Sequence, residues 1–232
     1  MMNSDSNLIS LIENFPVSAS IKESDTGKYV INNCHNLRQF GVGHWRDIAG
    51  LRIEDIKFHQ PEWGAHYARS VEMLDISARE TKTHAIGRHR FIDNYGDVQM
   101  EEMTKFPIIG IAGNVIGIAT YRHDITRTLP PIGIYRLYRN FYQISDAIKR
   151  ALIFFGVESS FISPPTEAQI CTFLLKVERY SNKEVARFMG ISDRTVECHC
   201  VALRNKIVDG DLARAALLLT RNLSCGDDSI QY

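Results

Sequence analysis

The triplet Cys198-His199-Cys200 contains three side chains of the kinds that bind zinc, and Glu197 beside it adds a carboxylate. Residues two apart on an α-helix lie about 200° apart around its axis, so on a helix the two cysteines could not contact one ion. No CxxC or HxxxH cluster elsewhere in the chain completes a tetrahedral set. We therefore predict no metal site here, provided that the segment is helical.

The surrounding residues do predict a helix. Ser192 is a good N-cap for it. Four side chains follow at steps of three and four and form one inward face, namely Val196, His199, Leu203 and Ile207. His199 is then expected to pack inside the protein. The side chains expected to face outward are Arg194, Thr195, Glu197, Cys198, Val201, Arg204 and Asn205.

This helix is the third of four expected over residues 164–222. Thr166 caps the first, whose apolar face is formed by Ile170, Phe173, Leu174 and Val177. Ser181 and Glu184 form a capping box at the start of the second, which ends at Gly190, and a fourth runs from about Asp211 to Thr220. A short helix, a turn with glycine and a longer helix form a helix-turn-helix, whose longer helix fits the DNA major groove, about 12 Å wide.

The stretch SNKEVARFMGISDRTVECHCVALRNKI resembles the LuxR-type (GerE-like) helix-turn-helix of bacterial transcription regulators. The residues that match its pattern are Ser181, Asn182, Lys183, Glu184, Ala186, Ile191, Ser192, Thr195, Val196, His199 and Lys206. The resemblance implies an all-α, four-helix DNA-binding domain. The chain departs from the pattern at Glu197, where the family usually has a base, and at residues 165–169, which are Pro-Thr-Glu-Ala-Gln in place of Leu-Thr-x-Arg-Glu.

If this domain binds DNA, its side chains divide by charge and reach. Phosphate contacts are expected from Ser181, Lys183, Ser192, Arg204 and Lys206. Base edges are expected to meet Arg194, Thr195, Glu197, Cys198 and Val201. A carboxylate is repelled by phosphates but can accept a hydrogen bond from the amino group of cytosine, so Glu197 either alters the sequence that is bound or weakens binding. For each residue singly, a solvated surface side chain is the alternative.

Residues 15–128 have the signals of strands and turns. The segments VSASIKES, DTGK and YVINN predict a β-hairpin with Gly27 in its turn. Short helical pieces, with no long periodic helix among them, are expected around CHNLRQFG, RIEDI and AHYARSVEMLD. Three long strands then follow, over THAIGRHRFI, VQMEEMTKFPII and VIGIATYRHDIT, so the fold class is α+β with a five-stranded antiparallel sheet.

This order of elements, with the closing His123-Asp124-Ile125-Thr126, resembles a PAS domain. The resemblance implies helices packed on one face of the sheet and a role as a sensor or dimerisation module. A PAS-like pocket could hold haem, flavin, a small metabolite or no ligand, and a protein could also be its signal. His66, His84 and His89 could serve as a haem ligand by their location, although a surface or hydrogen-bonded role is commoner for each, and no ligand-binding residue can be named.

Residues 129–163 are expected to connect the two domains. One helix is predicted from Gly133 to about Phe155, because apolar residues recur at steps of three and four. They are Ile134, Leu137, Phe141, Ile144, Ile148, Leu152 and Phe155. So narrow a stripe could pair with its copy in a homodimer or dock on the same chain.

The composition is that of an ordinary globular protein of 232 residues, with 27 basic and 27 acidic side chains. Bulk charge therefore indicates neither nucleic acid nor a membrane as partner. There is no signal peptide and no apolar run of eighteen residues, and the five cysteines lack the spacing of a disulfide framework, which favours a reduced cytoplasmic protein. GxSxG, HExxH, P-loop and GxGxxG patterns are absent, so no enzyme is indicated.

The sequence thus predicts five segments: an N-terminal segment (1–14), a PAS-like sensor domain (15–128), a connector helix and linker (129–163), a LuxR-type helix-turn-helix domain (164–222) and a tail (223–232). The predicted function is that of a homodimeric transcription regulator that binds double-stranded DNA. The alternative is a protein-interaction adaptor whose helical domain does not bind DNA.

Overall fold

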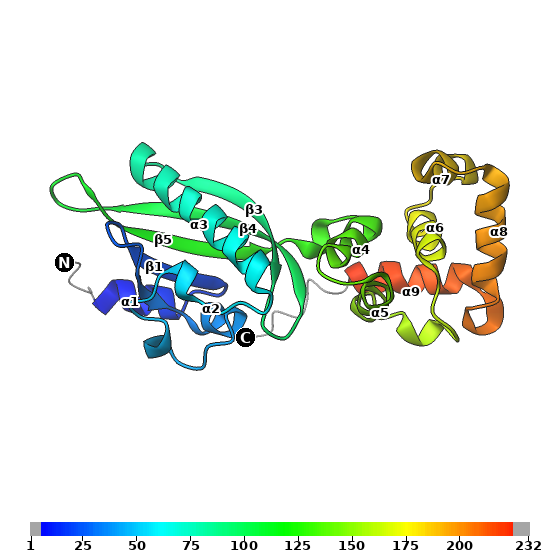
Figure 1. The fold of residues 1–232 in the computed structure, drawn as a ribbon, viewed down its shortest axis with the longest axis horizontal. Helices are drawn as coiled ribbons and strands as arrows, with labels where there is room; N and C mark the ends of the chain where they lie inside the picture. The colour runs from blue at the N-terminus through cyan, green and yellow to red at the C-terminus, as the bar shows by residue number, and fades with distance from the viewer. Residues whose placement is uncertain (1–5, 225–232) are drawn as a thin grey trace. The chain divides into compact units, whose positions relative to one another are not determined.

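The computed structural model describes residues 6–224, and the chain divides into two compact units, Met1–Ile125 and Thr126–Tyr232. The first unit contains a sheet with helices, and the second contains helices (Figure 1). The limits of the five segments named above stay predictions, and most of the expected tail lies outside the described residues.

The N-terminal unit is built on one sheet with the strand order β2-β1-β5-β4-β3. Its strands are β1 (Ser18–Glu23), β2 (Tyr29–Asn32), β3 (Ala85–Ile92), β4 (Val98–Ile109) and β5 (Val115–Asp124). All neighbouring strands pair antiparallel, so the expected five-stranded antiparallel sheet is confirmed. The β1–β2 hairpin is confirmed as well, and Gly27 in its turn has a φ of +68°, which a residue without a Cβ adopts at little cost.

Helices lie on both faces of this sheet. They are α1 (Ser6–Glu13), α2 (Cys34–Gln39) and α3 (Pro61–Thr81), with short 3-10 turns η1 (Trp45–Asp47) and η2 (Ile53–Asp55). Helix α3 packs on one face, against β3, β4 and β5. Helix α1, which the sequence did not predict, packs on the other face through Ile12, against Ala19, Ile21 and Ile31.

The expectation of short helices only is wrong for α3, which has 21 residues. Its buried side is formed by small, aromatic and aliphatic residues, including Gly64, Tyr67, Val71 and Ala78, so its apolar stripe is weak in the sequence. Pro61 at the first position of α3 favours the start of a helix. The C-cap of α3 is Lys82, which has the left-handed φ of 54°, whereas glycine is the residue that usually signals such a helix end.

The C-terminal unit consists of helices around an apolar core. They are α4 (Pro131–Arg139), α5 (Ile144–Phe154), α6 (Glu167–Val177), α7 (Asn182–Met189), α8 (Asp193–Arg204) and α9 (Leu212–Ser224), with 3-10 turns η3 (Thr126–Thr128), η4 (Glu158–Ser160) and η5 (Val208–Gly210). The four helices expected after residue 164 are α6 to α9. Phe173 and Leu174 of α6, Val196 and Leu203 of α8 and Leu219 of α9 are fully buried in this unit.

The single connector helix expected from Gly133 to Phe155 is wrong, because α4 ends at Arg139 and α5 begins at Ile144. The chain contains neither glycine nor proline at the break, so the apolar spacing continues through it. Asn140 caps α4 and donates a side-chain hydrogen bond to the carbonyl of Arg136, at 2.6 Å. Asparagine competes in this way with helical hydrogen bonds and favours an end of the helix.

The expected dimerisation seam stays a prediction, and its residues differ in burial. Five of its seven residues are at most 3 % exposed within the chain itself, namely Ile134, Leu137, Ile148, Leu152 and Phe155. They belong to the core of the C-terminal unit, because two short helices can fold their apolar faces inward where one long helix would have displayed them. Phe141 is half-buried and Ile144 is 41 % exposed.

Candidate functional site

The helix-turn-helix is held by local hydrogen bonds at its helix starts. The hydroxyl of Ser181 accepts from the amide of Glu184 at 3.3 Å, and the Glu184 carboxylate accepts from the amide of Ser181 at 2.7 Å. Gly190 then ends α7 with a φ of +68°, and the hydroxyl of Ser192 accepts from the amide of Thr195 at 3.1 Å. Both predicted caps are confirmed, and together they fix the turn between α7 and α8.

Helix α8 separates an apolar side from a polar side as the spacing predicts. Val196 and Leu203 have no exposed surface, and His199 is half-buried. On the other side the structure places five exposed candidates together, namely Arg194, Glu197, Cys198, Val201 and Arg204, with Thr195 partly exposed beside them. The α8 face expected to meet DNA therefore exists as an exposed surface of the C-terminal unit, and Figure 1 shows α8 along one side of that unit.

Glu197 keeps a free carboxylate on this face. Within residues 6–224, no side-chain hydrogen bond or ion pair joins it to Arg194, three positions earlier on the helix. An exposed surface pair would contribute little to stability in any case. The two opposite charges thus remain available to groups outside the chain.

Lys183 and Lys206 differ in their surroundings. Lys183 is exposed in the first turn of α7, whereas Lys206 is half-buried and its ammonium donates to the carbonyl of Pro164 at 2.8 Å. Lys206 thereby fastens the end of α8 to the segment before α6, where the amide of Ile162 also donates to the carbonyl of Lys206. Of the two, Lys183 is the freer cation for a phosphate.

The departure at residues 165–169 has a structural account. The hydroxyl of Thr166 accepts from the amide of Gln169, and the Gln169 side chain accepts from the amide of Thr166 at 2.9 Å. Gln169 therefore completes a capping box at the start of α6. Glu167 accepts from Arg139 at 2.9 Å and from the hydroxyl of Tyr135 at 3.1 Å, which ties α6 to α4.

The cysteines of α8 do not converge on a common point. Cys198 is exposed and Cys200 is half-buried on a helix that is continuous from Asp193 to Arg204. Among residues 6–224, no group of three or more histidine, cysteine, aspartate or glutamate side chains is arranged to hold a metal ion.

The N-terminal unit contains a second set of functional groups, which lies between the sheet and α3. Arg122 of β5 is 4 % exposed and donates to the hydroxyl of Tyr67 at 3.0 Å and to Ser18 at 3.0 Å. It also contacts the side chain of Asn36, and its guanidinium lies over the ring of Phe40, 4.7 Å from the centroid. This cation is thus surrounded by the protein's own acceptors and aromatic rings.

Glu101 supplies the matching negative charge. Its carboxylate lies 3.5 Å from Arg122 and accepts a hydrogen bond of 2.6 Å from Tyr67. Burial raises the pKa of Glu101 above its usual range, and Arg122 offsets only part of that effect. One cation and one carboxylate meet here, so this cluster is balanced in charge.

A neighbouring cluster is not balanced. Asp75 of α3 lies 2.8 Å from the ammonium of Lys22 on β1 and 2.7 Å from that of Lys105 on β4. Burial alone would raise the pKa of Asp75, but the two lysines lower it below its usual value. Burial lowers the pKa of Lys105 to about 8, although Asp75 opposes this.

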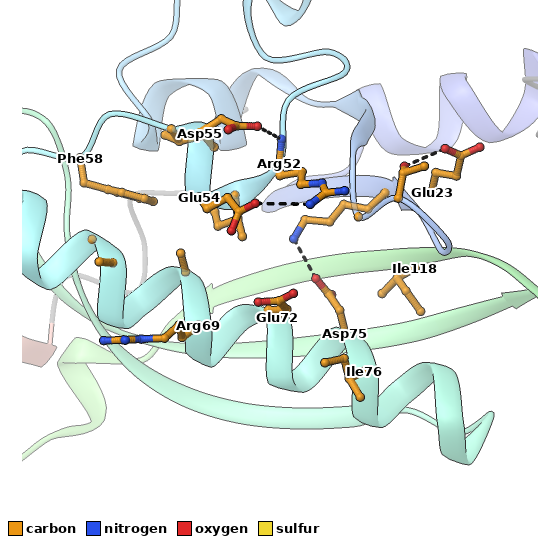
Figure 2. A pocket seen from close by; sticks show the side chains of 18 of the residues that line it. Glu23, Arg52, Glu54, Asp55, Phe58, Arg69, Glu72, Asp75, Ile76 and Ile118 are labelled. Carbon is orange, nitrogen blue, oxygen red and sulfur yellow. Dashed lines mark hydrogen bonds and ion pairs between the residues drawn. The ribbon is translucent and has the colours of Figure 1, made fainter.

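A pocket of about 830 Å³ opens beside this cluster, between α3, η2 and the β1–β2 hairpin. In Figure 2 Asp75 points from α3 toward Lys22, to which a dashed line joins it, and Ile118 of β5 is another of the lining residues. Apolar residues from η2, α3 and the segment between them line other parts of it, including Ile53, Phe58 and Ala68. Charged residues of both signs complete the lining, among them Arg52, Glu54 and Glu72. A concave site that combines apolar surface with buried polar groups such as Lys22 is typical of small-molecule sites.

Sequence reasoning did not find these groups. The polar residues among the buried side chains alternate along the strands, as Ser18, Ser20 and Lys22 on β1 and as Thr120 and Arg122 on β5. The alternation itself could have been detected, but a polar alternating set normally predicts the solvent face of a sheet. Of the histidines considered for haem, His66 and His84 are exposed, and His89 lies on the inner side, its ring 5.8 Å from that of Tyr67.

Comparisons with known proteins agree with this architecture. No family model and no curated protein matches the chain. Among solved structures, the chain is similar to Vibrio cholerae VqmA in its complex with a ligand and DNA. The TM-score is 0.54 and the sequence identity 19%, and the match covers 94% of this chain and 89% of that chain. The chain is also similar to a phage VqmA–DPO complex (TM-score 0.49, 20% identity, 97% and 88% of the chains) and to the PAS domain of Bordetella pertussis BvgS (0.44, 18%, 51% and 84%).

At 19% sequence identity, the likeness to the Vibrio cholerae VqmA complex shows a shared fold. The expected fold class, a PAS-like α+β unit followed by an all-α helical unit with a helix-turn-helix, is therefore confirmed. In the described part of the chain, no helix is both long enough and apolar enough to cross a bilayer.

Proposed function

We propose that this chain is a transcription regulator in which a PAS-like sensory unit controls the DNA binding of a LuxR-type helix-turn-helix unit. The observation that supports this most directly is the free polar face of α8, presented by the capped α7–Gly190–α8 turn. The VqmA to which the chain is similar was solved with both a ligand and DNA, which agrees with the proposal. The proposed function includes no catalytic step, and it places the protein in the cytoplasm, where bacterial DNA lies.

In this proposal the contacts to DNA divide by position. Lys183, together with the free amides at the starts of α7 and α8, is placed to bind phosphates and set the register of the protein on the duplex. Arg194, Glu197 and Val201 are exposed along α8 and are placed for base edges. Arginine pairs well with guanine, and a carboxylate accepts from the amino group of cytosine.

Two copies acting together would bind two half-sites related by a twofold axis. The five buried residues of the connector cannot form the contact between copies without opening the core. Dimer contacts must therefore come from exposed side chains, among which Ile144 stays a candidate at 41 % exposure. A ligand in the sensory unit would shift the regulator only if it binds one arrangement of the dimer more tightly than another.

The test is selection of bound DNA from a random pool by the full-length protein. We expect an enriched twofold-symmetric motif that Lys183→Ala and Arg194→Ala abolish or weaken, by about 1–3 kcal/mol for a base-contacting arginine. Lys149→Ala is the matched control, because Lys149 is an exposed cation of the same unit on α5. If no motif is enriched with folded protein, the adaptor function is favoured instead.

Glu197 allows a second measurement on the same site. Glu197→Lys should raise affinity for nonspecific DNA and steepen its dependence on salt by up to about one released counterion. Glu197→Gln should change the preferred base at one position of the motif while leaving the rest unchanged. Identical titrations of the wild type and Glu197→Lys at two salt concentrations would contradict a groove-facing position.

A further inference from the structure

The cluster formed by Lys22, Asp75 and Lys105 contains two ammonium groups and one carboxylate. Lys22 and Lys105 are 2 % and 1 % exposed, so water shields neither of them well. The neighbouring Arg122–Glu101 cluster, in contrast, has one charge of each sign. An excess positive charge inside a protein is costly unless another group compensates it.

The two ammonium groups also have unused hydrogen-bonding capacity. An ammonium has three donors. In the described structure each of these two groups has one hydrogen-bonding or ion-pair partner, the carboxylate of Asp75, and Lys22 lies besides over the ring of Tyr29, 4.9 Å from the centroid. Buried donors without partners cost free energy, so the cluster favours a further acceptor.

The pocket adjoins this cluster directly. Lys22, Asp75 and Ser24 are among the residues that line its volume of about 830 Å³. The buried hydroxyls of Ser24 and Thr120 have no hydrogen-bond partner in the described structure. Thr120 lies opposite Lys105 in the sheet register, on the same inner face. The pocket wall therefore includes the donors of Lys22 and Ser24, and Ile53, Phe58 and Ile118 add apolar surface to it.

We propose that this pocket binds a small organic acid with an apolar body, whose anionic oxygens accept hydrogen bonds from Lys22 while Lys105 supplies the second positive charge. This inference rests on the proposed sensory function and names the chemical class of the signal. The anion would complete the charge balance of the cluster, and the apolar body would lie against Phe58 and Ile118. A neutral molecule of the same shape would leave the excess charge in place.

Lys105 provides a specific readout of this mode of binding. Burial lowers its pKa to about 8, and the charged groups that face it are Asp75, which raises the pKa, and Lys22 and Arg122, which lower it. His89, on the adjacent strand, is also on this side of the sheet, and burial lowers its pKa. A bound anion would raise the pKa of Lys105, so binding should take up protons near pH 8 and none near pH 6.5.

The experiment uses the purified full-length protein and three acids with their own primary amides: benzoate with benzamide, nicotinate with nicotinamide, and phenylacetate with phenylacetamide. Thermal unfolding followed by tryptophan fluorescence reports binding to this unit, because Trp45 and Trp63 both lie in it. We expect at least one acid to raise the Tm while its amide does not. Calorimetry in buffers of different ionisation enthalpy should then show uptake of about half a proton per ligand at pH 8.

Substitutions distinguish a direct role from a structural one. Lys22→Met and Lys105→Met should each weaken binding of the acid by about 10- to 100-fold. Lys28→Met, which removes an exposed lysine from the same hairpin, should leave it unchanged. If one methionine variant fails to fold by circular dichroism, the other still tests the site.

The proposal is overturned if the amides bind as well as the acids, if no acid raises the Tm of the folded protein, or if binding takes up no protons at pH 8. DNA selection with the same preparation keeps the two proposals apart. An enriched motif without acid binding would refute the ligand class and leave the regulatory function standing. Acid binding without an enriched motif would support the ligand class and count against DNA binding.

Discussion

The N-terminal unit buries several charged side chains, whereas the C-terminal unit keeps the charged side chains of α8 exposed. In the N-terminal unit Lys22, Glu101, Lys105 and Arg122 are at most 4 % exposed. In the described part of the C-terminal unit the buried polar side chains are uncharged, namely Thr126, Gln169 and Thr172, and the charges of α8 face solvent. A surface that meets a polyanionic duplex needs its charges outside, whereas a pocket that selects a small molecule needs them inside.

The two units also differ in which interactions stabilise them. The apolar core of the C-terminal unit stabilises it through burial of side chains such as Phe173 and Leu174, which have no exposed surface. The interior charges of the N-terminal unit stabilise it only while each has its partner. Substitution of one partner should therefore affect the N-terminal unit most, and the tests below run from the largest effect to the smallest.

Arg122→Met should give the largest loss, about 3–5 kcal/mol in the free energy of unfolding of the N-terminal unit. The reason is that Glu101 would keep a buried charge without its cation. Urea unfolding followed by tryptophan fluorescence measures this unit alone, because both tryptophans lie in it. The double variant Arg122→Met with Glu101→Leu should recover much of the loss, and equal instability of both variants would argue against the charge explanation.

Lys105 should produce a smaller, pH-dependent effect. Its pKa is lowered to about 8 in the folded protein, so between that pH and its unfolded value the unfolded state binds more protons. Stability from this group therefore rises as the pH rises, by about 2 kcal/mol between pH 7.5 and 9.5. The measurement compares unfolding of the wild type and Lys105→Met at the two pH values. The same pH dependence in both proteins would show that Lys105 is not the source.

Ser181→Ala tests local structure in the other unit. The loss of the cap on α7 should cost about 1 kcal/mol of helical stability, because the amide of Glu184 loses its acceptor. Circular dichroism at 222 nm during urea unfolding should detect this change, while the tryptophan transition of the N-terminal unit should stay where it is. A shift of the tryptophan transition as well would mean that the two units do not unfold independently.

Arg88→Ala should have the smallest effect, within about 0.5 kcal/mol. Arg88 forms an ion pair with Glu102 at 3.0 Å, but on the outer face of the same sheet whose inner face holds Arg122. The comparison of these two arginines isolates burial, since both pair with a glutamate of β4. A loss comparable to that of Arg122→Met would refute the division into inner and outer charges.

Local features of the fold follow from short stretches of sequence. The caps at Thr166, Ser181 and Ser192 and the turns at Gly27 and Gly190 are where the residue types predict them. Each depends on hydrogen bonds and backbone angles within about four residues, which neighbouring side chains settle. The polar face of α8 could be predicted for the same reason, since helical periodicity alone separates it from Val196 and Leu203.

The interior of the sensory unit and the fate of the connector could not be predicted in this way. Lys22 and Asp75 are 53 residues apart in the chain, and their contact exists because α3 packs across the sheet. The alternation on β1 and β5 separates two faces of the sheet but does not say which of them is buried. Both are covered, because α1 packs on the face opposite to α3. The connector's apolar stripe likewise becomes core only because the chain turns back at Asn140.

The sequence by itself thus determined the helix-turn-helix, its caps and its outward polar face, because those features depend on residues close together in the chain. Only the tertiary structure decided that Lys22, Lys105 and Arg122 lie inside and that the connector residues are buried. Burial depends on which distant segments pack together, and no pattern within one strand or helix contains that information.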